Sequence, residues 1–537
     1  MELDFTGLTQ PGRRQPVFAR HGAVATSQPL AAASGLRVLQ DGGSAADACV
    51  AMAAALTVVE PSGNGLGSDA FALVWDAGRL HGLNGSGRSP AAWDAARLRA
   101  AGLTAVPTFG WASVTVPGAV RAWADLHARC GRLPFDRLLA PAIELAEEGH
   151  PVSGVVAGQW AQAAEEAASR TAPEFAGWGP TFAPAGRAPR VGEVWRSPGH
   201  AATLRAIAAT GGADFYEGDL AERTASFARQ TGGLLTAGDL AAHRSEWVEP
   251  ISTNYRGDDV WEIPPSGQGI AALIALNIAE GFEPSSPGDP DAWHRHIEAT
   301  KLALADAERY VADPEHADVP AAELLAKPYA DARRRLIGAR ALDPAPGAPR
   351  GSDRGSDTVY LCAVDGRGQH CSFIQSNYRG FGSGVVVPGT GISLQNRGCG
   401  FTLAPGHPNE LAPGKRPFHT IIPGFLSRDG RPLGPFGVMG GSVQAQAHLQ
   451  VVVDTVDAGD DPQTALGRPR WRWESGRRVL LEPTVDPAVA EGLRARGHDV
   501  AIADPLNFGR GQIIWSLADG VLVAGSEPRA DAYPLGW

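Results

Sequence analysis

The stretch from Asp343 to Asp365 reads DPAPGAPRGSDRGSD and then TVYLCAVD, and its composition changes between Asp357 and Thr358. The first part consists of Pro, Gly, Ala, Ser, Asp and Arg and offers almost nothing for a core to bury, which predicts an exposed, mobile connector. The second part is rich in β-branched and aromatic residues, as is typical of a strand. The sequence therefore predicts a strand that starts at Thr358, directly after a connector over residues 343–357.

Helices are predicted mainly before this connector and strands mainly after it. Ala-rich residues 28–61 carry Leu and Val on one face and predict two helices separated by the turn Asp41-Gly42-Gly43. Helical stretches continue over about residues 118–342. Strands are predicted at residues 70–75, 79–83, 370–378, 384–396, 512–517 and 520–524, and a glycine-dense loop, PSGNGLGSD, lies at 61–69.

Composition excludes several classes of protein. The 537 residues are 44% hydrophobic and 20% charged, which is ordinary for a globular chain, and the formal charge is 47 − 58 = −11. An acidic chain without a basic cluster is a poor partner for nucleic acid. The N-terminus lacks the basic start and apolar run of a secretory signal, and no apolar run is long enough to span a bilayer. We therefore expect a soluble, cytoplasmic protein.

No cofactor or metal is expected from the sequence. The five cysteines include no C-x-x-C pair, which argues against a disulfide framework and a zinc site. His294 and His296 lie in a helical stretch without the i, i+4 spacing of a metal pair, so we interpret them as surface or packing residues. The glycine-rich stretches at 85–90 and 266–281 lack the full phosphate-loop and dinucleotide patterns.

Six segments along the chain carry a family resemblance. They are ATSQPLAAASGLRVLQDGGSAADACVA, EPSGNGLGSDAF, GSDTVYLCAVDGRGQ, FGSGVVVPGTGISLQNRG, GKRPFHTIIPG and GVMGGSVQAQAHLQ, in this order. Together they resemble the γ-glutamyltranspeptidase family, a branch of the N-terminal-nucleophile hydrolases, from about His21 to the C-terminus. The resemblance implies an α+β fold, the four-layer αββα sandwich with two stacked antiparallel sheets between helical layers.

The resemblance also implies self-cleavage. Members of the family are made as one chain and cut themselves before a threonine, which matches Thr358 here and makes Asp357–Thr358 the expected cleavage site. A large fragment of residues 1–357 and a small fragment of residues 358–537 would form a heterodimer, and a dimer of such pairs is left open. Both fragments would share one core, so the cut is not a domain boundary.

One residue would then supply both nucleophile and base. A hydroxyl needs a neighbouring base to attack an amide, and the new α-amino group of Thr358 has a reference pKa of about 7.7–8.0, suited to that task near neutral pH. By resemblance, Ser376 hydrogen-bonds the nucleophile's amine. Gly440 and Gly441, in VMGGS, match the family's oxyanion hole, where backbone N–H groups need an unblocked approach.

The expected substrate pocket combines family-like and unusual residues. Arg88, in NGSGRSP, matches an arginine that grips the substrate's α-carboxylate in the family, and a guanidinium suits a two-bond grip on a carboxylate. The family's serine pair is replaced by His419 and Thr420, in PFHTIIPG.

The positions expected to bind an α-amino group differ more. They are Tyr378, Arg397 and Gly400, where the glutamyl enzymes carry Asn, Gln and an acid. None is anionic, and Arg397 would repel an ammonium group. Residues 401–415 form a shorter stretch than the family's lid loop, which favours hydrolysis over transfer to an acceptor amine.

Three functions stay open. The departures resemble a side branch that includes cephalosporin acylases and oxamate amidohydrolase, which act on amides bearing a carboxylate but no glutamyl α-amine. Hydrolysis of a small-molecule amide with a carboxylate-bearing acyl group is therefore the main prediction, with substrate size undecided. The alternatives are true γ-glutamyl transfer or hydrolysis on glutathione-like compounds, and an unprocessed, non-catalytic binding protein.

Overall fold

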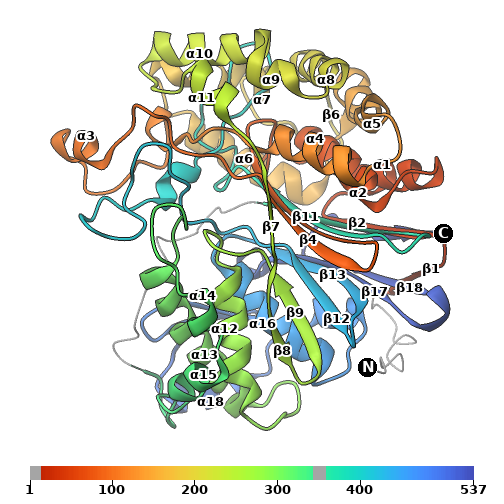
Figure 1. The fold of residues 1–537 in the computed structure, drawn as a ribbon, viewed down its shortest axis with the longest axis vertical. Helices are drawn as coiled ribbons and strands as arrows, with labels where there is room; N and C mark the ends of the chain where they lie inside the picture. Colours follow the sequence, from red (N-terminus) through yellow and green to blue (C-terminus); the bar gives the residue numbers. More distant parts are fainter. Residues whose placement is uncertain (1–13, 343–357) are drawn as a thin grey trace.

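The computed structural model describes residues 14–342 and 358–537, so the predicted connector and Asp357 lie outside the described residues. Two seven-stranded sheets are stacked on each other, and helices cover the outer face of each (Figure 1). This is the predicted αββα sandwich.

The first sheet combines strands from both sides of the connector. In spatial order it contains β19 (Leu535–Gly536), β2 (Gly22–Thr26), β10 (Val359–Asp365), β11 (His370–Ser376), β3 (Asp69–Asp76), β4 (Arg79–Asn84) and β7 (Glu246–Val248). All its pairings are antiparallel. Strand β10, which follows Thr358, lies between β2 of the large part and β11 of the small part.

The second sheet is also antiparallel and also mixed. It contains β1 (Val17–Ala19), β18 (Leu522–Ser526), β17 (Arg510–Ser516), β13 (Arg431–Met439), β12 (Gly424–Arg428), β9 (Asp258–Glu262) and β8 (Ile251–Tyr255). Two small sheets join β14 (Trp471–Ser475), β15 (Arg478–Leu481) and β16 (Asp499–Ile502), and β5 (His150–Pro151) with β6 (Val194–Trp195).

One helical layer lies above the first sheet in Figure 1 and one below the second. The upper helices are α1 (Pro29–Gln40), α2 (Ala45–Val59), α4 (Ala119–Cys130), α5 (Phe135–Glu148), α6 (Gly154–Ala167), α7 (Trp178–Phe182), α8 (Pro198–Thr210), α9 (Ala213–Glu217), α10 (Asp219–Thr231) and α11 (Ala237–Ala242). The lower ones are α12 (Gly269–Glu280), α13 (Pro290–Tyr310), α14 (Ala321–Leu324), α15 (Lys327–Arg334), α16 (Val443–Val456) and α18 (Pro487–Ala495). Beside them lie α3 (Ala95–Ala100) and α17 (Pro462–Gly467).

Strand β10 is buried on both faces. Val359, Leu361 and Ala363 belong to the core under the upper helices, whereas Tyr360, Cys362 and Val364 belong to the core between the sheets and the lower helices. This alternation is the period-two pattern of a strand. Helix α2 covers the upper face, begins with a reciprocal Ser44–Asp47 capping box and is buried along its whole length.

Most predicted elements are confirmed. The two N-terminal helices and the strands at 70–75, 79–83, 358–365, 370–378, 512–517 and 520–524 are present with shifts of a few residues. The predicted strand at 384–396 is wrong: this segment is a loop with two isolated bridges, one between Val386 and Ser393 and one between Leu394 and Gly67. Pro388 cannot donate to a ladder, and Gly389 and Gly391 shortly after it have φ of +71° and +74°, which explains the difference. Within the described residues, no helix has the length and apolar character needed to cross a membrane.

Candidate active site

Thr358 directly precedes β10 and faces the end of β11. The register pairs Val359 with Gln375, which places Ser376 opposite Thr358. The two hydroxyl oxygens are 2.9 Å apart, and the Ser376 oxygen also accepts a hydrogen bond from the N–H of Tyr378 at 2.7 Å. Thr358 is 1% exposed and Ser376 is fully buried, so water does not compete for these contacts.

The glycine-dense loop at 61–69 packs against the threonine. A Cβ at Gly63 would lie 3.3 Å from the Thr358 nitrogen, and the Gly63 carbonyl accepts the N–H of Asn377 at 3.2 Å. The Ser68 hydroxyl donates to the Asn377 side chain at 2.9 Å. The sequence showed the glycine density of this loop but gave it no role, and the structure explains it by the close approach to Thr358.

Gly440 and Gly441 form the turn between β13 and α16. Their φ angles of +134° and +67° favour glycine. The Gly441 carbonyl accepts from the Gln268 side chain at 2.9 Å and from the Gln444 N–H at 3.1 Å, and Gln268 also donates to the Thr420 carbonyl. Among the described residues, no hydrogen-bond acceptor meets the N–H of Gly440 or Gly441. Both are therefore available to a ligand, and Gln268, which no sequence motif indicated, holds the turn in place.

Arg397, Thr420 and Tyr378, which the family resemblance assigned to the substrate pocket, lie together. The guanidinium of Arg397 donates to the Thr420 hydroxyl at 2.7 Å and lies 4.1 Å from the centre of the Tyr378 ring. Arg397 begins the short helix η4 (Arg397–Gly400), which also contains Gly400. A buried guanidinium beside a hydroxyl and an aromatic face suits a substrate carboxylate.

His419 directly precedes Thr420, and its side chain contacts Asp69 at the start of β3. Its Nε2 lies 3.2 Å from the Asp69 carboxylate, and its ring meets Phe71 edge-on. Burial, together with the positive charges of Arg397 and Arg416, holds the pKa of His419 well below its ordinary value. Burial raises the pKa of Asp69 to about 7, against the opposing effect of Arg397. His419 is therefore neutral, and its contact with Asp69 is a hydrogen bond rather than an ion pair of a charged imidazole.

Arg88 lies in an acidic cluster. Its guanidinium contacts the carboxylates of Glu315 at 2.8 Å, Glu246 at 3.1 Å and Asp313 at 3.2 Å, and donates to the Gly414 carbonyl at 3.1 Å. These partners occupy the donors that a substrate carboxylate would need. The structure thus places Arg88 in a network between the large and small parts, and a direct grip on substrate would require one of these ion pairs to break.

One group of side chains has metal-binding composition. His294, Glu298 and His498 are buried, with ligand atoms within 4.8 Å of one another. The His294 and His498 rings hydrogen-bond each other at 2.8 Å, His294 also contacts the Gly338 carbonyl, and the Lys301 ammonium lies 2.7 Å from Glu298. Burial lowers the pKa of His498 to about 3 and that of His294 below its usual value. The group is thus a buried hydrogen-bond network with its own cation, and His294 is a packing residue.

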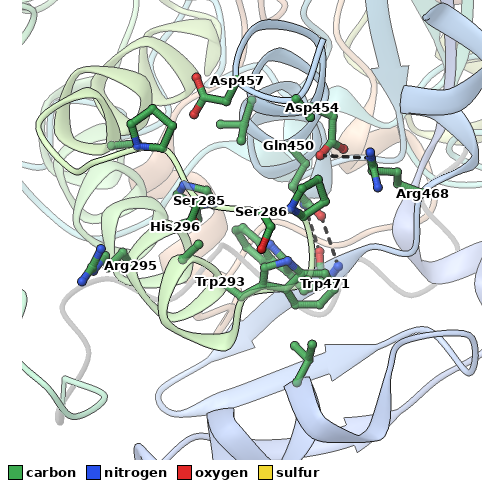
Figure 2. A pocket seen from close by; sticks show the side chains of 18 of the residues that line it. Ser285, Ser286, Trp293, Arg295, His296, Gln450, Asp454, Asp457, Arg468 and Trp471 are labelled. Carbon is green, nitrogen blue, oxygen red and sulfur yellow. Dashed lines mark hydrogen bonds and ion pairs between the residues drawn. The ribbon is translucent and has the colours of Figure 1, made fainter. Parts of the chain in front are cut away.

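A cavity of about 250 Å³, shown with its lining side chains in Figure 2, lies against the C-terminal half of α16, which begins after the glycine turn. It is lined by Trp293, Trp471 and the carboxylates of Asp454 and Asp457. Burial raises the pKa of Asp454 to about 7, while Arg468, 3.7 Å away, opposes this rise. None of the predicted site residues is among the lining residues that the structure describes, and the part of α16 that lines the cavity begins at Gln450, about 14 Å along the helix from the glycine turn. This cavity is not the active site.

The αββα layering is that of the N-terminal-nucleophile hydrolases, and the buried Thr358 directly precedes the central strand β10. A cephalosporin acylase from Bacillus halodurans has a similar structure, with a TM-score of 0.95 and 52% identity over 100% of this chain and 99% of that one. A γ-glutamyltranspeptidase from Helicobacter pylori matches with a TM-score of 0.55 and 28% identity, over 58% of this chain and 90% of that one.

Sequence relatives agree with the structural comparison. The oxamate amidohydrolase proenzyme of Klebsiella pneumoniae is 38% identical over 540 residues, covering 96% of this chain and 98% of the relative. The glutathione hydrolase-like YwrD proenzyme of Bacillus subtilis is 37% identical over 520 residues, covering 94% and 97%. The family model described as gamma-glutamyltranspeptidase matches residues 31–537. The chain belongs to the γ-glutamyltranspeptidase family and is an enzyme of its hydrolase and acyltransferase type.

Proposed function

We propose that this protein is an autoprocessing amidohydrolase that cuts itself between Asp357 and Thr358 and then uses Thr358 as an N-terminal nucleophile. The observation that carries the proposal is the 2.9 Å contact between the hydroxyls of Thr358 and Ser376, directly before β10. The relatives named as proenzymes support the same reading.

The reaction would proceed in two steps. The new α-amine of Thr358 takes the hydroxyl proton while the oxygen attacks the amide carbonyl, and the N–H groups of Gly440 and Gly441 stabilise the oxyanion. The C–N bond breaks, the amine leaves with a proton, and the acyl group stays on Thr358. Water then hydrolyses the ester and releases the acid. Ser376 orients the nucleophile throughout.

The acyl group would carry a carboxylate bound by Arg397 and Thr420, with Tyr378 packed on the guanidinium. Arg397 is 1% exposed, so a charge-assisted hydrogen bond there is shielded from water. His419 and Arg88 are assigned positioning roles, through Asp69 and through the acidic cluster. A γ-glutamyl substrate is disfavoured because its ammonium group would meet Arg397 rather than an acid.

The mature enzyme would be a heterodimer of fragments 1–357 and 358–537, and its short 401–415 segment favours hydrolysis over transfer. That segment folds onto α3, where Phe401, Leu403 and Leu411 pack against Trp93 and Leu98. A cytoplasmic location is part of the proposal, supported by buried free thiols at Cys49, Cys130, Cys362 and Cys371, which suit a reducing compartment.

The test is intact mass and N-terminal sequencing of the purified protein, beside Thr358→Ala. Cleavage gives fragments of roughly 37 and 19 kDa, the smaller beginning Thr-Val-Tyr, while the variant stays whole. Cleaved protein is then assayed on anilides of oxalic, succinic and glutaric acid and on a γ-glutamyl anilide. A wild-type chain that stays intact and inactive supports the binding-protein alternative, and preference for the γ-glutamyl compound supports the transpeptidase alternative.

A further inference from the structure

An open cavity of about 590 Å³ adjoins the glycine turn of the proposed oxyanion hole. Gly440 is one of its lining residues, and its other walls come from α6, from residues 379–384 and from residues 504–509, which include the short helix η5 (Pro505–Phe508). A Cβ at Gly440 would lie 3.1 Å from the Cα of Gly509, so the turn and this last wall are in contact.

Thr358 does not line this cavity, but the residues that contact it are neighbours in the chain of residues in the cavity walls. Its wall at residues 379–382 directly follows Tyr378, whose N–H donates to Ser376. The N–H of Phe381, another wall residue, donates to the Ser62 carbonyl at 2.9 Å, one residue from the Gly63 that packs on Thr358. A substrate whose carbonyl sits between Thr358 and Gly440 therefore reaches this space with one of its two halves.

The acyl half belongs elsewhere. Arg397, Thr420 and Tyr378, which are proposed to hold the acyl carboxylate, are not among the described residues that line the cavity. The acyl chain and the amine leave the carbonyl carbon in different directions, so an acyl group directed to Arg397 directs the amine to the cavity. This step rests on the proposed function.

The walls indicate what kind of amine fits. Phe109, Trp178 and Phe381 supply aromatic surface, and three arginines against two carboxylates leave a net charge of 3 − 2 = +1. These are Arg170, Arg379 and Arg472 against Glu166 and Asp504. Arg170 is engaged by Glu166 at 3.6 Å and by the Phe109 ring.

Arg472, on β14, is a guanidinium in this wall that has no carboxylate partner among the described residues. It is 7% exposed, and one of its terminal nitrogens donates to the Asn507 carbonyl at 3.2 Å. Its Nε has no hydrogen-bond partner among the described residues, and no carboxylate there forms an ion pair with it. The indole nitrogen of Trp178 is likewise buried without a partner in the described chain. Buried donors of this kind are costly unless an acceptor arrives.

The geometry points to an amine half that is large and anionic: a ring-bearing or otherwise bulky amino acid whose carboxylate pairs with Arg472 and whose body lies on the aromatic wall. A leaving group as small as ammonia would occupy about the volume of one water molecule, roughly 30 Å³, and leave most of the space filled with solvent. Pockets of several hundred Å³ are typical of sites for drug-sized molecules.

The test varies the amine at a constant acyl group. The acyl group with the fastest anilide hydrolysis is chosen first, and its amides with aniline, 3-aminobenzoate and ammonia are compared on the cleaved enzyme. We expect kcat/KM to be about 10-fold or more higher for the 3-aminobenzoate amide than for the anilide, with the primary amide slowest. Arg472→Gln should remove this carboxylate preference. Arg478, on the neighbouring strand β15, forms an exposed ion pair with Asp499. Arg478→Gln is therefore the matched control and should retain the carboxylate preference.

A second measurement does not depend on the folding of the variant. Free 3-aminobenzoate should inhibit the wild type at a concentration about 10-fold lower than aniline does. Equal rates for the anilide and the 3-aminobenzoate amide, together with equal inhibition by the two amines, would overturn the inference. If the cleaved enzyme hydrolyses none of the anilides, the proposed function fails instead, so the two failures are distinguishable.

Discussion

Ser376→Ala tests whether the contact with Thr358 serves chemistry or only packing. The substitution removes an oxygen that lies 2.9 Å from the Thr358 hydroxyl and accepts the Tyr378 N–H at 2.7 Å, in a fully buried position. A buried group left without its partner costs about 1–3 kcal/mol, so two such losses lower the free energy of unfolding by about 2–6 kcal/mol. The loss of the contact between the Ser376 and Thr358 hydroxyls should slow both self-cleavage and turnover about 10- to 100-fold.

Ser372→Ala is the matched control. Ser372 lies four residues earlier on β11, on the same face, is also fully buried, and its hydroxyl meets that of Tyr360 at 2.7 Å. Both variants should lose comparable stability in thermal or denaturant unfolding, whereas only Ser376→Ala should slow the appearance of the small fragment by mass and reduce kcat on the best anilide. Equal cleavage rates and equal kcat in the two variants would refute the orienting role of Ser376.

Three further predictions concern charge and close packing. Asp454→Asn should gain stability over the wild type as pH rises from about 4 to about 7, because a raised folded-state pKa means that ionisation penalises only the folded wild type. The difference in free energy of unfolding between the variant and the wild type, measured with urea, should widen by at most about 4 kcal/mol, and by less because the Asp454 side chain is 20% exposed. A difference that stays constant with pH would contradict the prediction. Arg397→Gln should lower kcat/KM on a carboxylate-bearing anilide about 10- to 100-fold, whereas Arg88→Gln should mainly lower the unfolding midpoint; the reverse order would return the direct carboxylate contact to Arg88. Gly67→Ala places a Cβ 2.3 Å from a backbone carbonyl oxygen and should cost about 1–3 kcal/mol, while Gly158→Ala, with open space around it, should not destabilise; equal melting temperatures would show that the glycine loop can move.

Sequence patterns predicted individual helices and strands because hydrophobic period and turn chemistry are local properties, whereas the four layers were implied by the family resemblance. The alternation in TVYLCAVD is visible in the sequence, and the structure uses both of its faces, Val359 towards the helices and Tyr360 towards the second sheet. The segment at 384–396 misled because Val385–Val387 resembles a strand, yet Pro388 and two glycines with positive φ bend the chain too often for a ladder to form.

The candidate site residues were predicted from their match to the family's motifs, and the fold explains one of these pairs directly. Ser376 faces Thr358 because the β10–β11 hairpin brings them into register. Gln268 could not be found in this way, since its partners at Thr420 and Gly441 lie more than 150 residues away along the chain. The acidic partners of Arg88 are equally distant in sequence, so their occupation of its guanidinium was invisible before the fold was known.

The interleaving of β10 between β2 and β11 has a consequence for how the molecule can be assembled. A cut before Thr358 severs one covalent connection and leaves both hydrogen-bonded ladders of β10 intact. Once unfolded, however, the two pieces must find each other by diffusion, whereas the precursor holds them at a high effective concentration. The cleaved enzyme should therefore regain activity after denaturation only inefficiently and in a concentration-dependent way. Its lifetime should be determined by its unfolding rate rather than by a reversible folding equilibrium.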